Sequence, residues 1–166
     1  MLNFFKKKNK FQVMAVANGK TLDITKVNDP IFSQKMMGEG IAIVLDGNDI
    51  YAPCAGEITV LPESKHAFGM KCENGMEILV HVGIDTVNLQ GEGFEAFKAV
   101  GDRVDCHDKI LSVDRELIAS KGIDLTTMII ILNHTNYKID KMHTDVVVKA
   151  SSDPIIDIGW GKTWKL

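Results

Sequence analysis

The segment from His66 to Val87 constrains the fold of this chain more than any other. It reads HAFGMKCENGMEILVHVGIDTV, with Asn74-Gly75 between two apolar stretches. This dipeptide suits a tight type I′ hairpin turn, in which both central residues need positive φ. A two-residue turn would pair Phe68 with His81 and place His66 diagonally from it on the same face, about 7–8 Å away. A bulged Glu-Asn-Gly loop would weaken this inference, because a slip of one residue sends the two histidines to opposite faces.

The second half of this segment alternates between two kinds of residue. One row is apolar, and the other is mixed: Met76, Ile78, Val80, Val82 and Ile84 against Glu77, Leu79, His81, Gly83 and Asp85. The alternation predicts a strand with one face in the core. The mixed row is typical of the wall of a shallow, partly wet site, where Gly83 lets a ligand come close. The alternative is that His81 is a half-exposed surface histidine.

Composition sets looser bounds. The chain has 166 residues, 45% of them hydrophobic and 25% charged, which suits one soluble domain with a sizeable core. Its net charge of −3 does not indicate binding to nucleic acid, because proteins that bind nucleic acid carry basic patches. Three widely spaced cysteines predict neither a disulfide framework nor a zinc knuckle, and they indicate a reducing compartment. We expect no signal peptide, and no apolar run comes near the length of a membrane span.

The first ten residues differ in character from the rest. They read MLNFFKKKNK, with apolar residues followed by four lysines among five positions. Such a segment is usually a flexible, solvated tail. It could also lie on an anionic membrane surface, with its apolar residues between the head groups. We therefore divide the chain into a basic amphipathic tail, residues 1–10, and a single domain, residues 11–166.

Beyond residue 10 the sequence predicts short strands punctuated by turns. The expected strands cover Phe11–Ala17, Ile41–Leu45, Ile50–Tyr51, Glu57–Leu61, Met128–Leu132, Thr144–Lys149 and Ile155–Ile158. Two short helices are expected, one capped by Asp29 with Pro30 at its first position and ending at Gly38, the other running from Asp114 to near Gly122. This spacing favours an all-β sandwich or barrel. The tripeptide Gly-Glu-Gly occurs at both 38–40 and 91–93, a weak sign of internal repetition.

These residues resemble the glucose-family enzyme IIA of the bacterial phosphoenolpyruvate-dependent sugar phosphotransferase system. The matching motifs, in the family's order and spacing, are GEGIAI at 38–43, YAP at 51–53 with Gly56, HAF at 66–68, HVGIDTV at 81–87, GEGF at 91–94 and GDRV at 101–104. They cover most of the chain from about residue 11. The segment from Asn133 to His143 matches poorly, so His134 and His143 inherit no role.

The resemblance implies a phosphotransferase component that serves sugar transport through a transient phosphohistidine. His81 would accept a phosphoryl group from phospho-HPr and pass it to a cysteine of a IIB domain, with His66 as its stabilising partner and the Ser64 hydroxyl in support. The implied fold is a compact antiparallel β-sandwich, or barrel-sandwich hybrid, built on a duplicated motif with short helices. Lys65 stands where the family commonly has Asn. The family's docking surface would map onto Asp29, Phe32, Met36, Met37, Phe68, Asp85 and Val87.

The chemistry of the residues fits this assignment. A neutral imidazole nitrogen is a competent nucleophile toward phosphorus, and the N–P bond remains labile enough to donate again. The phosphoryl group needs donors, which the His66 imidazole and backbone N–H groups after Gly83 could supply. Met36 and Met37 suit docking with several partners because thioether side chains adapt their packing, although ordinary helix packing explains them equally well.

Other classes fit less well. LytM-like zinc peptidases share the duplicated fold but use an H-x-H pair, which is absent here. A biotinyl or lipoyl carrier would need a lysine within the stretch from Ser112 to Arg115, and there is none. A regulatory module that docks onto permeases and kinases remains compatible. We expect no required cofactor, although His66 and His81 could bind Zn²⁺ weakly with a partner's carboxylate. The expected location is cytoplasmic, with peripheral contact at the inner face of the membrane through the tail.

Overall fold

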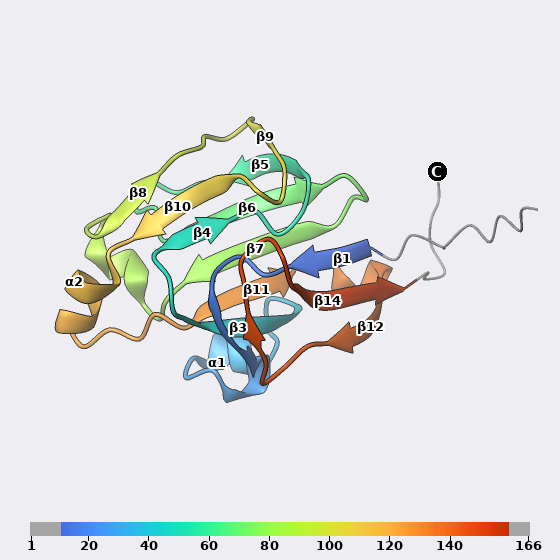
Figure 1. Ribbon diagram of the computed structural model, residues 1–166, viewed down its shortest axis with the longest axis horizontal. Coiled ribbons are helices and arrows are strands. Elements are labelled where there is room, and N and C mark those ends of the chain that lie inside the picture. The colour runs from blue at the N-terminus through green and yellow to red at the C-terminus, as the bar shows by residue number, and fades with distance from the viewer. Residues whose placement is uncertain (1–10, 160–166) are drawn as a thin grey trace, which may run out of the picture.

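Among the residues that the structure describes, the fold consists of three antiparallel sheets, which confirms the all-β prediction (Figure 1). The computed structural model describes residues 11–159, so the predicted N-terminal tail lies outside the described residues. The largest sheet has eight strands, in the order β13 (Val147–Val148), β2 (Gly19–Asp23), β3 (Glu39–Leu45), β11 (Thr127–Ile131), β7 (Glu77–Val82), β6 (Ala67–Cys72), β5 (Gly56–Val60) and β9 (Arg103–Val104).

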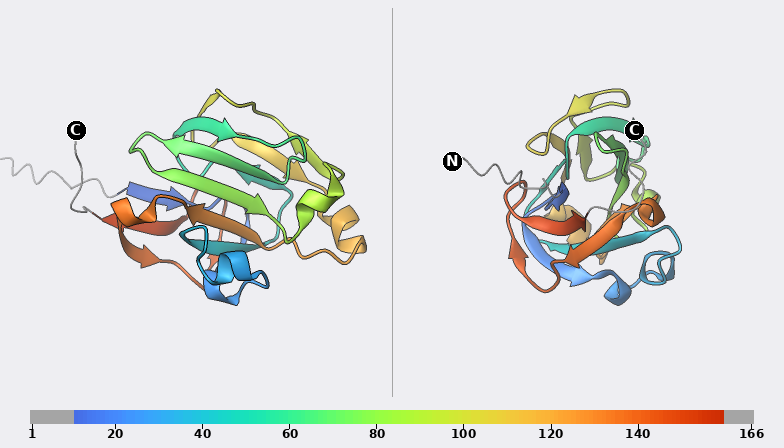
Figure 2. Two further views of the ribbon diagram at one scale, coloured as in Figure 1. Left: turned by 180° about the vertical axis from the view of Figure 1, so that it is seen from behind. Right: turned by 90° about the vertical axis from the view of Figure 1, so that its right-hand side faces the viewer.

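Two smaller sheets have three strands each. One is ordered β1 (Phe11–Met14), β14 (Pro154–Gly159) and β12 (Lys138–Met142), and the other β4 (Asp49–Tyr51), β10 (Lys109–Val113) and β8 (Phe94–Ala96). In Figure 1, β4, β8 and β10 lie in front of β6 and β7, and the rear view in Figure 2 shows the reverse. The sheets form no closed barrel.

The main core lies between the large sheet and the two small ones. Residues from all three sheets meet there without exposure to solvent, for example Phe68 and Val80 of the large sheet, Leu111 of β10 and Ile156 of β14. Four members of the predicted apolar row, from Met76 to Val82, are buried in this core, whereas the fifth, Ile84, is half-buried and lies outside it. Burial of this row stabilises the fold by about 1.5–3 kcal/mol for each large aliphatic side chain.

A second, smaller core lies on the opposite face of the large sheet. The short 3₁₀ helix η1 (Ile24–Lys26) and the helix α1 (Pro30–Ser33) cover that face and contribute Ile24 and Phe32. These side chains pack against Met128 and Ile130 of β11, with Leu79 of β7 at the edge. The mixed face of β7 therefore borders a covered apolar patch, which we call the outer core.

The caps of both predicted helices are where the sequence places them, but α1 is shorter than expected. The Asp29 carboxylate accepts from the Ile31 N–H at 3.0 Å, and that of Asp114 accepts from the Leu117 N–H at 3.0 Å, where it caps α2 (Arg115–Ser120). The helix α1 stops at Ser33 rather than near Gly38, because Lys35 adopts the left-handed conformation with a φ of 57°. Two further 3₁₀ helices are η2 (Thr86–Leu89) and η3 (His134–Asn136).

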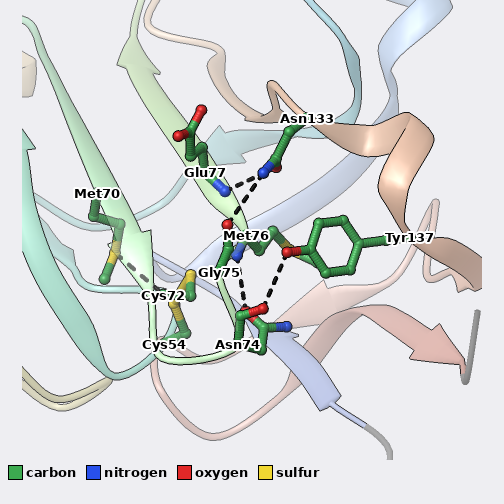
Figure 3. Close-up of a disulfide and its surroundings, with 9 residues drawn as sticks. All are labelled: Cys54, Met70, Cys72, Asn74, Gly75, Met76, Glu77, Asn133 and Tyr137. Atoms are coloured by element: carbon green, nitrogen blue, oxygen red, sulfur yellow. Dashed lines mark hydrogen bonds between the residues drawn. A yellow bond between two sulfur atoms is a disulfide. The ribbon is translucent and has the colours of Figure 1, made fainter. Parts of the chain in front are cut away.

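The expected register of the β6–β7 hairpin is wrong by one residue. His81 pairs with Ala67 rather than Phe68, and the connection is the three-residue loop Glu73-Asn74-Gly75. Cys72 closes this loop by donating its N–H to the Met76 carbonyl at 2.8 Å. Distant side chains hold the bulged loop, as Figure 3 shows: the Tyr137 hydroxyl donates to the Asn74 carbonyl at 3.0 Å, and the Asn133 amide donates to the Gly75 carbonyl at 3.1 Å.

The sequence predicted no disulfide framework among the cysteines, but the structure contains one disulfide. Cys54, between β4 and β5, is bonded to Cys72 at the end of β6, with Cα atoms 6.2 Å apart (Figure 3). Both residues belong to the main core, and the Met70 sulfur lies 3.9 Å from the Cys54 sulfur. The odd total is explained by Cys106, which remains a free thiol. The cysteine count therefore does not carry the inference of a reducing compartment.

Candidate functional site

The site is centred on His81, on the face of β7 that borders the outer core. Its two neighbours across the sheet are Ala67 of β6 and Met128 of β11. The Phe32 ring of α1 lies 5.1 Å from the His81 ring between centroids, and the His66 ring lies 4.9 Å away in an edge-on arrangement. The two histidines that the sequence singles out are thus brought together, with an aromatic ring beside them.

His66 reaches His81 by a route that the strand pairing does not provide. In the observed register, the backbone of His66 lies opposite Val82 and accepts its N–H at 2.7 Å. A regular strand would then direct His66 away from His81. However, His66 comes before the first residue of β6 and follows Lys65, whose φ of 53° turns the chain at that point. The His66 Nδ1 atom lies 2.5 Å from the Ser64 hydroxyl, so the residue expected in support does contact the ring.

A backbone hydrogen bond fixes which nitrogen of His81 is available. The Nδ1 atom lies 2.9 Å from the Gly83 carbonyl oxygen. Because a carbonyl can only accept, Nδ1 must carry the hydrogen. The neutral ring then has its lone pair on Nε2. Nε2 is therefore the ring nitrogen of His81 whose lone pair is available.

The structure gives Gly83 a different role from the one expected. A side chain at this position would meet the Thr86 methyl group at 2.5 Å, and the φ of Gly83 is +85°. Its missing side chain thus makes room for Thr86, not for a ligand. Two backbone N–H groups at this point are already bonded: that of Gly83 donates to the Thr126 carbonyl at 3.1 Å, and that of Ile84, the first after Gly83, donates to the Asp124 carbonyl at 2.8 Å.

Both histidines favour the neutral form. Burial lowers the pKa of His66, and the neighbouring His81 lowers it further. Burial also lowers the pKa of His81, while the hydrogen bond to Gly83 and the charges of Asp29 and Asp85 act in the opposite direction. Burial outweighs these terms. An uncharged imidazole is the form that can attack phosphorus.

The seven expected docking residues divide into three groups. Phe68 is 0% exposed and packs in the main core, so it cannot contact a partner, and its assignment is wrong. The cause is the one-residue register shift, which turns Phe68 away from His81. Phe32 is 4% exposed and lies against the His81 ring beneath the surface. The other five are exposed or half-buried: Asp29, Met36, Met37, Asp85 and Val87.

The structure adds residues that the motifs did not single out. Ile31, next to Phe32 on α1, is 48% exposed and joins the two methionines and Val87 among the exposed large apolar side chains. Leu79 and Ile84 edge the outer core on either side of His81 along the chain. The alternation of β7 could have identified Leu79, since it shares the mixed row with His81.

Two negative findings concern the described residues, 11–159. No group of three or more His, Cys, Asp or Glu side chains converges there in a way that could hold a metal ion. None of the helices in the same range is long and apolar enough to cross a membrane.

Comparisons with known proteins agree with this geometry. Residues 11–137 match the family model described as phosphoenolpyruvate-dependent sugar phosphotransferase system, EIIA 1. The glucose-specific EIIA component of Oceanobacillus iheyensis is 38% identical over 160 residues, which are 94% of this chain and 97% of the relative. That of Bacillus cereus is 43% identical over 127 residues, 76% of this chain and 77% of the relative. The solved structure of glucose permease IIA from Mycoplasma capricolum superposes with a TM-score of 0.84 at 33% identity and covers 94% of this chain and 99% of its own.

The antiparallel β-sandwich and its pair of adjoining histidines agree with the class of phosphocarrier that these comparisons indicate. The chain belongs to the EIIA 1 family of the phosphoenolpyruvate-dependent sugar phosphotransferase system. Its function is that of a phosphocarrier in this sugar transport system.

Proposed function

We propose that His81 is the residue that carries the phosphoryl group. The observation that supports this most strongly is the hydrogen bond from Nδ1 to the Gly83 carbonyl, which leaves the Nε2 lone pair free. In the loading step, the bond from His81 Nε2 to phosphorus forms as the N–P bond of phospho-HPr breaks. The electron pair of the broken bond returns to the histidine nitrogen of HPr, which leaves with a neutral imidazole. In the unloading step, a IIB cysteine thiolate attacks phosphorus, and the electron pair of the broken bond returns to Nε2.

His66 stabilises the phosphoryl group in this proposal. Its ring lies edge-on to that of His81, with 4.9 Å between centroids, and its Nδ1 is occupied by the Ser64 hydroxyl. If the hydroxyl donates to Nδ1, the proton of the neutral ring is on Nε2, from where it can be donated to a phosphate oxygen. The backbone N–H groups of Gly83 and Ile84 are already bonded within the protein, so they are not available to the phosphoryl group. The Nε2–H of His66 is therefore a more important donor than the sequence indicated.

The exposed rim of the site is the proposed docking surface for HPr and for IIB. Ile31, Met36, Met37 and Val87 are between 40% and 69% exposed and supply apolar contact area. The charges of Asp29 and Asp85 both act on His81, so the two carboxylates lie within electrostatic range of its ring. A basic side chain of a docked partner can pair with them during transfer. An open rim of this kind allows the same histidine to be loaded by one partner and unloaded by another.

Location and metal dependence belong to the same proposal. We place the protein in the cytoplasm, where the donor and acceptor proteins act, with residues 1–10 as the segment that could contact an anionic membrane. No metal is needed for the chemistry above. A zinc ion would find only the two imidazoles in the described part of the site and would need a partner's carboxylate to complete a tetrahedral set.

Reconstitution tests the proposal. Phosphoenolpyruvate, enzyme I and HPr are mixed with this protein, and intact mass spectrometry follows an acid-labile phosphoryl adduct. The wild type should gain one phosphoryl group, mapped by peptide analysis to His81. His81→Ala should gain none. His66→Gln should load and then transfer to IIB about 10²–10³ times more slowly, because Gln cannot change its charge as the phosphate leaves.

The outcome that contradicts the proposal is equally direct. Loading of His81→Ala, or phosphate found on His66 in the wild type, would reverse the two roles. Absence of any adduct on the wild type would refute the phosphohistidine. His134 offers a matched control, because it is a described histidine in η3, outside the site, and His134→Ala should load as the wild type does.

A further inference from the structure

The two peptide groups on either side of Gly83, just after His81, are both held by hydrogen bonds. The peptide group between Val82 and Gly83 is bonded on both edges: its carbonyl accepts from the Thr86 hydroxyl at 2.5 Å, and its N–H donates to the Thr126 carbonyl at 3.1 Å. The next peptide group is also bonded on both edges. Its carbonyl, that of Gly83, accepts from His81 Nδ1, and its N–H, that of Ile84, donates to the Asp124 carbonyl.

One side chain stands out among these contacts. Every other group that fixes the two peptides is backbone or the functional histidine itself, whereas Thr86 acts through its hydroxyl. Thr86 is 0% exposed, and its methyl group fills the space beside Gly83 that a side chain there would occupy. A buried threonine beside a glycine with positive φ thus both fills the loop and bonds to it.

The Gly83 conformation explains why this bond matters. Glycine passes readily between regions of φ and ψ that other residues avoid, so the peptides on either side of it can rotate unless they are held. Rotation at Gly83 would swing its carbonyl away from His81 Nδ1. The ring would then lose the acceptor that selects its tautomer, and the form with the proton on Nε2 would become accessible. In that form Nε2 has no lone pair to offer.

We infer that Thr86 is a positioning residue for His81: its hydroxyl fixes the Val82–Gly83 peptide and so holds the Gly83 carbonyl where it keeps His81 in the Nδ1–H tautomer. Thr86 itself touches neither phosphate nor partner in this role. The inference rests on the proposed function of His81 for its effect on transfer, but its effect on the tautomer is independent of that function.

The test compares Thr86→Val, which keeps the shape and removes the hydroxyl, with Thr86→Ser, which keeps the hydroxyl. Two-bond and three-bond ¹H–¹⁵N correlation spectra of the histidine rings report the tautomer directly. We expect wild type and Thr86→Ser to show His81 with its proton on Nδ1, and Thr86→Val to show a measurable Nε2–H fraction. Acceptance of phosphate from phospho-HPr should slow by about 10- to 100-fold in Thr86→Val, the range seen when a functional histidine in a metal site loses its orienting partner.

Thr21 provides a matched control for mere destabilisation. It lies on β2, outside the contacts of His81, and is 1% exposed. Its hydroxyl donates to the His143 carbonyl at 2.5 Å. Thr21→Val should lower stability as Thr86→Val does, yet leave the tautomer and the transfer rate unchanged.

Two results would overturn the inference. One is an unaltered His81 tautomer and rate in Thr86→Val; the other is an equal loss in Thr21→Val. Should Thr86→Val fail to fold, Thr86→Ala is measured by the same spectra, and an Nδ1–H tautomer there would also overturn it. Failure of the proposed function looks different, because the wild type would then take up no phosphate while the tautomer change in Thr86→Val persisted.

Discussion

The disulfide between Cys54 and Cys72 should stabilise the domain without affecting phosphoryl transfer. The two residues are 18 positions apart, so the bond closes a loop of that size in the unfolded chain. The loss of loop-closure entropy on cross-linking gives a stabilisation of about 3 kcal/mol at 25 °C. Native domains have a total stability of about 5–15 kcal/mol. Reduction should therefore remove a substantial part of the stability.

The bond lies at the end of β6 away from the site. Cys72 is the last residue of the strand, whereas His66 precedes its first residue. Between them the strand is paired to both β5 and β7, which hold it whether or not the sulfur atoms are joined. Reduction should consequently leave the contact between the two histidine rings, and the rate of phosphoryl acceptance, unchanged.

Urea unfolding followed by far-ultraviolet circular dichroism measures the effect. With a denaturant slope of about 2 kcal/mol per molar, a loss of 3 kcal/mol moves the midpoint down by about 1–2 M. Alkylation of free thiols and mass spectrometry verify the redox state of each sample. Cys106→Ala, which removes the free thiol, should show the same difference between oxidised and reduced protein, and Cys72→Ala should show none.

Two results would refute the reasoning. If alkylation under oxidising conditions labels all three cysteines, the pairing itself is wrong. If the bond forms fully but the oxidised and reduced midpoints coincide, the loop-closure argument fails, because the buried sulfur atoms would then contribute as much when separate as when joined.

The sequence predicted the local features of this fold well. The inward row of β7 and both helix caps depend on neighbours one to four residues apart, and each is found where the pattern placed it. What the sequence missed depends on partners far along the chain. The hairpin loop contains the expected Asn74-Gly75, yet Asn133 and Tyr137, about sixty residues away, bind its carbonyls in the bulged form.

The contact between His66 and His81 was predicted for a partly wrong reason. The two-residue turn placed His66 and His81 on one face, but the observed register would separate them if both lay in regular strands. The left-handed conformation of Lys65 restores their contact. The motif therefore predicts that His66 and His81 are in contact. The backbone geometry that brings them together depends on the conformation of one residue, Lys65. Asn, common in the family at this position, adopts that conformation more readily than Lys.

Three further predictions follow from these positions. Phe68→Ala should lower the free energy of unfolding by about 3–5 kcal/mol in urea titrations, because the ring is fully buried. Met36→Ala should leave stability unchanged and weaken HPr binding in calorimetry. The opposite pattern would show that Phe68 belongs to the docking surface after all. Lys65→Asn should raise the urea midpoint by the equivalent of about 0.5–1 kcal/mol, since it relieves a left-handed backbone, and a lower midpoint would show that the lysine side chain outweighs that strain. The pH dependence follows from the lowered pKa of His66, whose ordinary value is 6.5. Above 6.5 the ring is neutral in both the folded and the unfolded chain, so it contributes no pH dependence there. As the pH falls below 6.5, the unfolded chain binds a proton that the folded chain does not, and the free energy of unfolding decreases until the lowered pKa is reached. Urea midpoints measured from pH 7.5 down to pH 5 should therefore fall more steeply in the wild type than in His66→Gln, which has no group to titrate at this position. Parallel curves for the two proteins would show that burial does not keep this histidine neutral.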